Sequence, residues 1–328
     1  MTLADAVRAR DRIAPYLRRT PLVKSAWLSE LSGASVSLKV ESLQLSSSFK
    51  TRGAFNAIIA RLERGMKPGT PIVTASAGNH GRALAEAAAT FKLPLRVFAP
   101  ADAAKNKLDA IRQLGAELNT EARDYDAAER LAKAFAADTG AAFISPYNDA
   151  DVVLGAATSA LEIFEDAPAT STIVAPIGGG GLISGLAMAA KALADRCEVI
   201  GVEADASAAF YAAVQAGHIV TIVPRATLAD GLGGNVDPET ITFGFIREFV
   251  DRIVTVSEDD LAAAITGLVE KEHLIAEGAG AAATAALVGR RIELTGRQVV
   301  VMLSGSNIDR QRLAQLIAPT TTSPPPPQ

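Results

Sequence analysis

The sequence predicts an α/β fold in which helices cover mostly parallel sheets. Short strand-like runs alternate with helical runs along most of the chain, which is typical of parallel strands joined by crossover helices. Two loops that contain glycine follow strand-like runs and open helical runs. With 49% hydrophobic residues among 328, the chain can form one large domain or two medium domains with buried cores.

The expected strands are short runs rich in valine, isoleucine, leucine and phenylalanine. They cover residues 36–40, 72–75, 95–98, 142–144, 172–175, 199–202, 252–256 and 298–303. The expected helices include 82–91, 104–114, 126–137, 150–164 and 259–274. Ser257 to Asp260 resemble a capping box at the start of the last of these helices. Residues 319–328, PTTTSPPPPQ, are expected to form a disordered tail.

Composition argues against several classes of protein. The formal charge of −4 and the lack of a basic block predict no nucleic-acid partner. The single cysteine, Cys197, cannot form an internal disulfide, and the N-terminus lacks a signal-peptide core, so a cytoplasmic location is expected. Residues 167–190 carry no charge and reach the length of a membrane span. Pro176 and the glycines after it favour a strand, a loop and a helix, so no membrane partner is expected.

The stretch SSSFKTRGAFN places Lys50 where a helix is expected to begin. Apolar residues recur at helical spacing after it, at Phe55, Ile58, Ile59, Leu62 and Met66. The exposed amides and the macrodipole of a helix N-terminus disfavour an ammonium group. Lys50 is therefore either a solvated loop lysine or an amine that condenses with a carbonyl.

A glycine loop joins the strand at 172–175 to a helical run. Bare backbones let consecutive amides approach an anion closely, and the helix N-terminus adds a favourable dipole. A phosphate site is expected, with a tight turn as the alternative. Ile183 stands where a dinucleotide fingerprint needs glycine, and no P-loop lysine follows. The loop consists of Gly178, Gly179, Gly180 and Gly181.

Two other loops follow strands. SAGNHG, residues 76–81, offers hydroxyl, amide and imidazole donors suited to a carboxylate, although its residues could also only cap the next helix. Ser304 follows the last strand, at the carboxyl edge of the sheet where α/β proteins bind ligands. It is expected either to contact a ligand there or to belong to an ordinary turn. The three histidines are not spaced as zinc ligands, and Glu203 with Asp205 suits a solvated loop better than a cation site.

SSSFKTRGAFN, SAGNHG, GGGGL and SGSN occur in this order between about residues 41 and 309. Together they resemble the fold-type II pyridoxal-phosphate enzymes, most closely the serine/threonine dehydratase and serine racemase group. The lysine motif of that group is usually Thr-Gly-Ser-Phe-Lys-x-Arg-Gly-Ala, so Ser46 and Ser47 replace threonine and glycine. The resemblance implies a two-domain fold like that of the tryptophan synthase β chain. The large cofactor domain would span 1–65 and 149–318, and the small substrate-loop domain 70–148.

The resemblance also implies roles for single residues. Lys50 would form the Schiff base with pyridoxal 5'-phosphate, and Phe49 would pack on its ring. Asn79 would bond the phenolic oxygen and Ser304 would face the pyridine nitrogen. The phosphate would be held by Gly178, Gly179, Gly180, Gly181 and Leu182, and the substrate carboxylate by Ser76, Ala77, Gly78, Asn79 and His80. The divalent-metal triad of the group is incomplete, because Ala209 replaces its later acid, so no metal is expected.

The activity implied by the resemblance is β-elimination. A small amino acid substrate, L-threonine or L-serine, would give a 2-keto acid and ammonia in a homodimeric enzyme. Racemases of the group have a second serine in the carboxylate loop, where Ala77 cannot donate a proton, so a dehydratase is favoured. A racemase stays open, and so does a dehydratase of phenylserine or hydroxyaspartate, since the changed serines and Arg82 can reshape the pocket. An oxidoreductase and a non-catalytic phosphate-binding protein are the alternatives from other classes.

Overall fold

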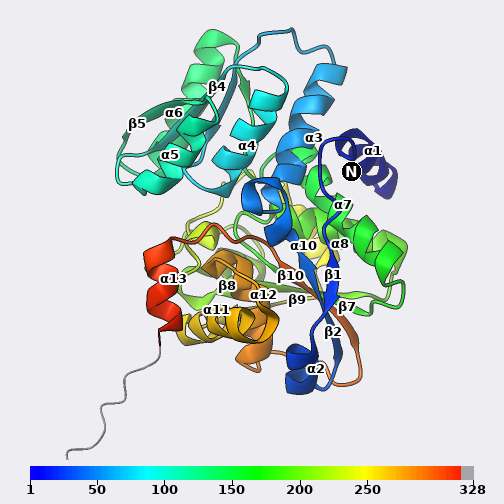
Figure 1. The fold of residues 1–328 in the computed structure, drawn as a ribbon. Coiled ribbons are helices and arrows are strands. Elements are labelled where there is room, and N and C mark those ends of the chain that lie inside the picture. Colours follow the sequence, from blue (N-terminus) through cyan, green and yellow to red (C-terminus); the bar gives the residue numbers. More distant parts are fainter. Residues whose placement is uncertain (319–328) are drawn as a thin grey trace, which may run out of the picture.

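The computed structural model describes residues 1–318 and contains two sheets with helices on both faces. One sheet lies in the upper lobe of Figure 1 and the other in the lower lobe. The predicted disordered tail at 319–328 lies outside the described residues.

The larger sheet has six strands in the order β1-β2-β10-β7-β8-β9. All neighbouring strands are parallel except β1 and β2. The strands are β1 (Leu22–Lys24), β2 (Ser35–Val40), β7 (Thr172–Pro176), β8 (Glu198–Ala204), β9 (Arg252–Val256) and β10 (Gln298–Leu303). One face packs against α1 (Leu3–Ile13), α7 (Ala150–Asp166), α8 (Gly181–Leu193), α9 (Ala209–Ala216) and α10 (Thr242–Phe249). The other packs against α2 (Ala26–Ser32), α11 (Glu258–Glu272), α12 (Gly278–Val288) and α13 (Arg310–Ile317).

Both faces of this sheet are buried. In β10, Val300 and Met302 belong to one core, while Val299, Val301 and Leu303 belong to the core on the other face. Successive side chains of a strand point to opposite faces, so a strand covered on both sides needs apolar residues at every position. This is why the central strands β7 and β10 read as nearly continuous apolar runs.

The smaller sheet has four parallel strands in the order β5-β4-β3-β6. They are β3 (Ile72–Ala75), β4 (Leu95–Pro100), β5 (Glu117–Ala122) and β6 (Ala142–Phe143). Helices α3 (Lys50–Glu63), α4 (Asn79–Thr90) and α5 (Lys105–Gln113) lie on one face, and α6 (Tyr125–Thr139) on the other. The strands of this sheet fall between residues 72 and 143, which supports the domain boundaries that we propose, 70–148 for the small domain and 1–65 with 149–318 for the large one.

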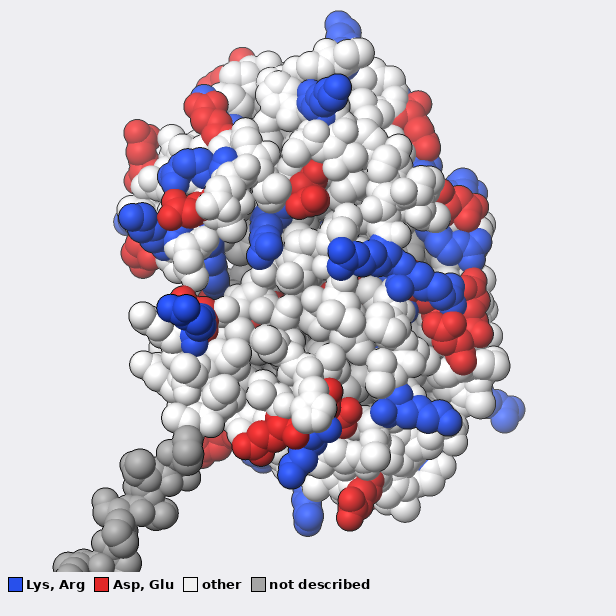
Figure 2. Space-filling view, in the orientation of Figure 1, with Lys and Arg blue, Asp and Glu red and all other residues white. Residues whose placement is uncertain are grey.

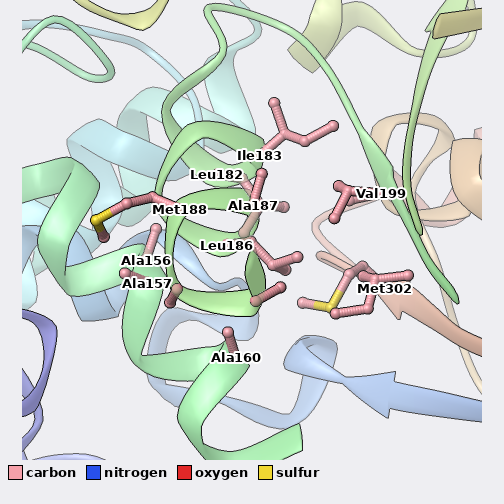
Figure 3. Packing of buried hydrophobic residues seen from close by; sticks show 14 of the residues in the cluster. Ala156, Ala157, Ala160, Leu182, Ile183, Leu186, Ala187, Met188, Val199 and Met302 are labelled. Carbon is pink, nitrogen blue, oxygen red and sulfur yellow. The ribbon is translucent and has the colours of Figure 1, made fainter. Parts of the chain in front are cut away.

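Helices α7 and α8 are in close contact beneath the glycine loop. Figure 3 shows the alanines of α7, among them Ala156 and Ala157, beside Leu186 and Met188 of α8. A Cβ at Gly185 would lie 2.2 Å from the carbonyl oxygen of Val153, so only glycine permits this approach. The contact holds the start of α8, and with it the glycine loop, against the rest of the large sheet.

The predicted strands are all present in the structure, and the capping box at Ser257 and Asp260 is confirmed. The segment 167–190 forms β7, a loop and α8, as predicted. None of the helices within residues 1–318 combines the length and the apolar character needed to span a membrane. Strand β5 was not predicted because its sequence, ELNTEA, is polar at an edge position. Helix α12 was not predicted because it is apolar all round and so lacks a helical period.

Candidate active site

Lys50 is the first residue of α3 and follows Phe49 directly. Its Nζ donates a hydrogen bond to the carbonyl oxygen of Pro146 at 2.8 Å and lies 5.1 Å from the centre of the Phe49 ring. The residue is half-buried, and among residues 1–318 no carboxylate pairs with its amine. Desolvation lowers the pKa of Lys50 to about 8. About a tenth of the amine is therefore neutral at pH 7, far more than for an ordinary lysine.

The backbone beside Lys50 is tied to the end of β10. Ser48 pairs with Gly305 as an isolated antiparallel bridge, and the amide of Phe49 donates to the carbonyl of Ser304 at 3.0 Å. The side chain of Ser304 is buried, and the Oγ of Ser48 is buried with no hydrogen-bond partner among the described residues. The structure thus brings Lys50 and Ser304, far apart in sequence, to one place.

Asn79 is the first residue of α4, which packs on the smaller sheet. Its side chain lies beside Gly305, close to the segment that contains Lys50. Its Nδ2 donates to Oε1 of Glu277, and its Oδ1 accepts from Nδ2 of Asn307 at 2.7 Å. Glu277 is buried, and this burial raises its pKa to about 7. A Cβ at Gly305 would lie 2.3 Å from Oε1 of Glu277 and 3.3 Å from Cβ of Ser48. Four residues from distant parts of the chain are therefore in close contact around the Cα of Gly305, namely Ser48, Asn79, Glu277 and Gly305 itself.

The glycine loop connects β7 to α8 and has free donors. Within the part of the chain that the structure describes, the amides of residues 178–180 donate to no partner. A Cβ at Gly179 would lie 2.3 Å from the ring of Tyr147, and Gly180 has a φ of 83°. The hydroxyl of Thr242 donates to the carbonyl of Gly179 at 2.9 Å. The loop is clamped on the side of Tyr147, next to Pro146, while its amides stay available to an anion.

The carboxylate loop opens into a cavity between the lobes. Ser76, Ala77 and Gly78 are half-buried, and the amide of Gly78 donates to Oγ of Ser76 at 3.3 Å. The cavity, of about 120 Å³, is lined by Ala77, Gly78, Asn79, Arg82, Asn106, Lys107, Ala110, Asn307 and Ile308. Its walls come from α4 and α5, which pack on the smaller sheet, and from the segment after β10 of the larger sheet, so the surroundings of both sheets contribute.

His80 differs from its neighbours in this loop. It is 2% exposed, and its Nε2 lies 3.3 Å from the carbonyl oxygen of Ile144. Burial, and then the charge of Lys50, lower the pKa of His80 to about 3, so the imidazole is neutral. It lies behind the loop and is not among the residues that line the cavity.

Three features of the site did not follow from the sequence. Glu277 beside Asn79 had one signal, an isolated acid in front of the uncharged run 278–289. The contact of Tyr147 with Gly179 had no signal, because the two residues meet only in the folded chain. The third is Arg52, which is buried between Glu41 and Glu162 near Lys50.

Glu203 lies in β8 and is 1% exposed, so the solvated loop expected there from the sequence is wrong. Its carboxylate accepts the amides of Phe210 and Tyr211, at 2.9 Å and 2.6 Å, and burial raises its pKa to about 7. Among the described residues no group of three or more histidine, cysteine, aspartate or glutamate side chains is arranged to hold a metal ion.

Comparison with known proteins gives consistent matches. The family model described as "Pyridoxal-phosphate dependent enzyme" matches residues 13–305. An L-threonine ammonia-lyase of Thermotoga maritima is 38% identical over 97% of this chain and 78% of its own. The maize serine racemase structure superposes with a TM-score of 0.89 and 30% identity over 96% of each chain. A threonine deaminase structure from T.th. has a TM-score of 0.85 and 34% identity over 94% of this chain and 99% of its own.

Proposed function

The chain belongs to the family of pyridoxal-phosphate dependent enzymes, and from that premise we propose that it is an ammonia-lyase acting on L-threonine or L-serine. The reaction removes the β-hydroxyl as water and releases ammonia and a 2-keto acid. The observation that carries the proposal is the amine of Lys50, which lies near a loop of free amides, has no carboxylate partner among residues 1–318, and has its pKa lowered to about 8. Such an amine can both attack a carbonyl and take up a proton.

The residues of the site fit pyridoxal phosphate. The free amides of Gly178, Gly179 and Gly180 at the start of α8 suit a phosphate group. A Cβ on Gly179 or Gly180 would collide with Tyr147 or Thr242, so glycine is needed for the loop to take this shape. The orphan hydroxyl of Ser48 lies beside Asn79 and needs a partner that the described residues do not supply. We propose that these residues, with Phe49, Leu182 and Ser304, hold the cofactor and that Lys50 bonds it covalently.

The cofactor, when bound, supplies an electron sink that acidifies the α-proton of an amino acid joined to it. The chain supplies the rest. Lys50 as a neutral amine takes the α-proton. The amides of 76–81 at the N-terminus of α4 orient the substrate carboxylate. Since the His80 imidazole is buried behind this loop, we propose that its backbone amide, not its ring, faces the carboxylate. Ser304 offers a neutral hydroxyl, so the site does not force a positive charge onto the ring it faces.

We propose elimination rather than racemisation because of Ala77, which lines the cavity. Inverting the α-carbon requires a proton donor on the face opposite to Lys50, and a methyl group has no proton to give.

The test is the reaction itself. Purified protein supplied with pyridoxal phosphate should be yellow, and borohydride should fix the reduced adduct on the Lys50 peptide. L-threonine and L-serine should each give keto acid and ammonia in equal amounts, measured with coupled dehydrogenase and ammonia assays. A protein that inverts serine and forms little keto acid would instead be a racemase, and one that takes up no pyridoxal phosphate would contradict the whole proposal.

Two expectations about the whole molecule are also proposals. We propose that the enzyme is a homodimer and that it works in the cytoplasm. Light scattering after size-exclusion chromatography measures the first, and fractionation of the source cell measures the second. A monomer that retains full activity would contradict the dimer.

A further inference from the structure

The cavity beside the carboxylate loop carries a positive charge without a counter-ion. Arg82 and Lys107 are the charged side chains among the described residues that line it. Lys107 is neutralised by Asp230, 2.6 Å away. Arg82 makes no ion pair within residues 1–318, and the hydrogen bond that its side chain makes there runs from Nη1 to Oδ1 of Asn307, at 2.6 Å. Its guanidinium keeps several donors for a ligand.

The position of this charge is costly unless an anion is present. Arg82 lies in the first turn of α4, where the helix macrodipole disfavours a cation. It is half-buried, so water only partly offsets that cost. The side chain shares the cavity with Ala77, Gly78 and Asn79, the same loop that is proposed to hold the substrate carboxylate. Figure 2 shows basic side chains bordering the hollow between the lobes on this face.

We propose that Arg82 is a specificity-determining residue that binds a second carboxylate, attached to the β-carbon of the substrate. The inference rests on the proposed elimination and changes its preferred substrate from L-threonine or L-serine to an acidic β-hydroxy amino acid. The preferred substrate is then a β-hydroxy amino acid with an acidic side chain, L-threo-3-hydroxyaspartate, which carries a carboxylate where threonine has a methyl group. The planar guanidinium can bond both oxygens of a carboxylate, whereas a methyl group would leave it unpaired.

The chemistry stays the same and is balanced. The α-carbon loses its proton to Lys50, and the β-carbon loses its hydroxyl, which departs as water after taking up one proton. The released enamine tautomerises, and one water molecule then hydrolyses it. Hydroxyaspartate thus gives oxaloacetate and one ammonia, with no net oxidation or reduction and no co-reactant. The β-carboxylate takes no part in these steps and is held only by Arg82.

Two other roles for Arg82 predict different data. It could bind the α-carboxylate that all amino acids share. It could also position Asn79 through Asn307, which donates to Asn79 Oδ1 at 2.7 Å. Either role affects every substrate equally, and the second also changes the absorption spectrum of the bound cofactor. Only a bond to the side chain of the substrate changes the ratio between substrates.

The experiment compares kcat/KM for L-threo-3-hydroxyaspartate and L-threonine in the holoenzyme and its variants. In Arg82→Gln the hydroxyaspartate-to-threonine ratio should fall roughly 30-fold, the size expected for one charge-assisted hydrogen-bonded pair, with threonine turnover within about threefold of the parent. The hydroxyaspartate-to-threonine ratio of Arg82→Lys should lie between those of the parent and Arg82→Gln. An ammonium keeps the positive charge but cannot bond both oxygens of a carboxylate in the planar geometry of a guanidinium. The double variant Lys107→Gln/Asp230→Asn is the matched control from the same cavity and should leave the ratio unchanged, because it removes a cation together with the anion that neutralises it.

A binding measurement separates failure of this inference from failure of the proposed function. Succinate should raise the melting temperature of the holoenzyme more than butyrate, its monocarboxylate analogue of the same chain length, and Arg82→Gln should abolish the difference. Turnover with an unchanged substrate ratio in Arg82→Gln, or a parent enzyme that prefers threonine, overturns the inference alone. No turnover of any β-hydroxy amino acid, with Arg82-dependent succinate binding intact, overturns the lyase proposal and leaves the dicarboxylate site standing.

Discussion

Lys50 and Arg52 are two cations two residues apart in the first turn of α3, and their surroundings are opposite. Arg52 is 2% exposed and bonds two carboxylates: Nε and Nη2 donate to Glu41, and Nη1 and Nη2 to Glu162, at 2.7–2.9 Å. Burial alone would lower the pKa of Arg52, but the attraction of both carboxylates outweighs it and the pKa is raised. The amine of Lys50 donates to the Pro146 carbonyl and pairs with no carboxylate among residues 1–318, and its pKa falls to about 8.

The difference shows how the first turn of one helix can hold both a charged residue that stabilises the fold and an amine that is easily deprotonated. Two carboxylates, Glu41 and Glu162, offset the cost of burying Arg52, so the guanidinium stays charged. Lys39 also pairs with Glu162, and these ion pairs connect β2, α3 and α7. Around Lys50 no carboxylate among residues 1–318 pairs with the amine, so burial lowers its pKa and the amine gives up its proton readily. A fully protonated lysine at this position could only pair with anions. A lysine that is partly neutral has a free lone pair, so it can act as a nucleophile and as a base.

The largest effect is expected from removing the uncompensated amine. Lys50→Ala should lower kcat for elimination at least about 10⁴-fold, because it removes both the covalent link to the cofactor and the base that takes the α-proton. The variant should stay folded by circular dichroism, since no ion pair is broken. Lys24→Ala, at a strand edge in the same domain, is the control and should keep full activity. If Lys50→Ala kept a tenth of the parent rate, Lys50 could not be both the residue that bonds the cofactor and the base that takes the α-proton.

Removing the compensated cation should instead affect stability. Arg52→Met leaves the buried carboxylate of Glu41 without its cation, so the free energy of unfolding should fall by about 3–5 kcal/mol. Urea denaturation followed by fluorescence measures this. Arg19→Met is the control, because Arg19 pairs with Glu165 and Asp166 at the surface, where such pairs contribute up to about 1 kcal/mol. A loss of under about 1 kcal/mol in Arg52→Met would mean that the cluster is not an anchor.

The same contrast explains what could be predicted from the sequence. Lys50, the glycine loop and Asn79 lie in short local motifs, so their residue types and spacing already indicated a site. The absence of a carboxylate near Lys50 and the two carboxylates on Arg52 arise from contacts between residues far apart in the chain, such as Arg52 with Glu162. Likewise, Glu277 reaches Asn79 only because two domains meet there. Local patterns therefore predicted which residues matter, but not the electrostatics that would make them work.

A pH series sharpens the comparison at Lys50. Its folded pKa, about 8, lies below the ordinary value of 10.5, so between these values the unfolded chain binds more protons and stability rises with pH. Relative to Lys50→Met, the cofactor-free protein should gain about 2 kcal/mol of unfolding free energy from pH 7 to pH 9.5. Denaturant titrations of both proteins at each pH measure the difference. A flat difference would mean that the amine is solvated or paired.

Glu277 offers the mirror-image test with the smallest expected effect. This carboxyl is buried like Arg52 but makes no ion pair within residues 1–318. Burial raises its pKa from 4.5 to about 7, while the bond from Asn79 and the charge of Lys107 offset part of that rise. The folded protein therefore binds more protons than the unfolded chain between these values, and stability falls as pH rises through this window. Glu277→Gln keeps an oxygen for Asn79 but cannot ionise. Between pH 6 and pH 7 the parent should lose about 1 kcal/mol relative to this variant, measured by denaturant titration of the cofactor-free proteins. If the two proteins instead changed in parallel, Glu277 would be ionised in the fold throughout this range, and burial would not be raising its pKa.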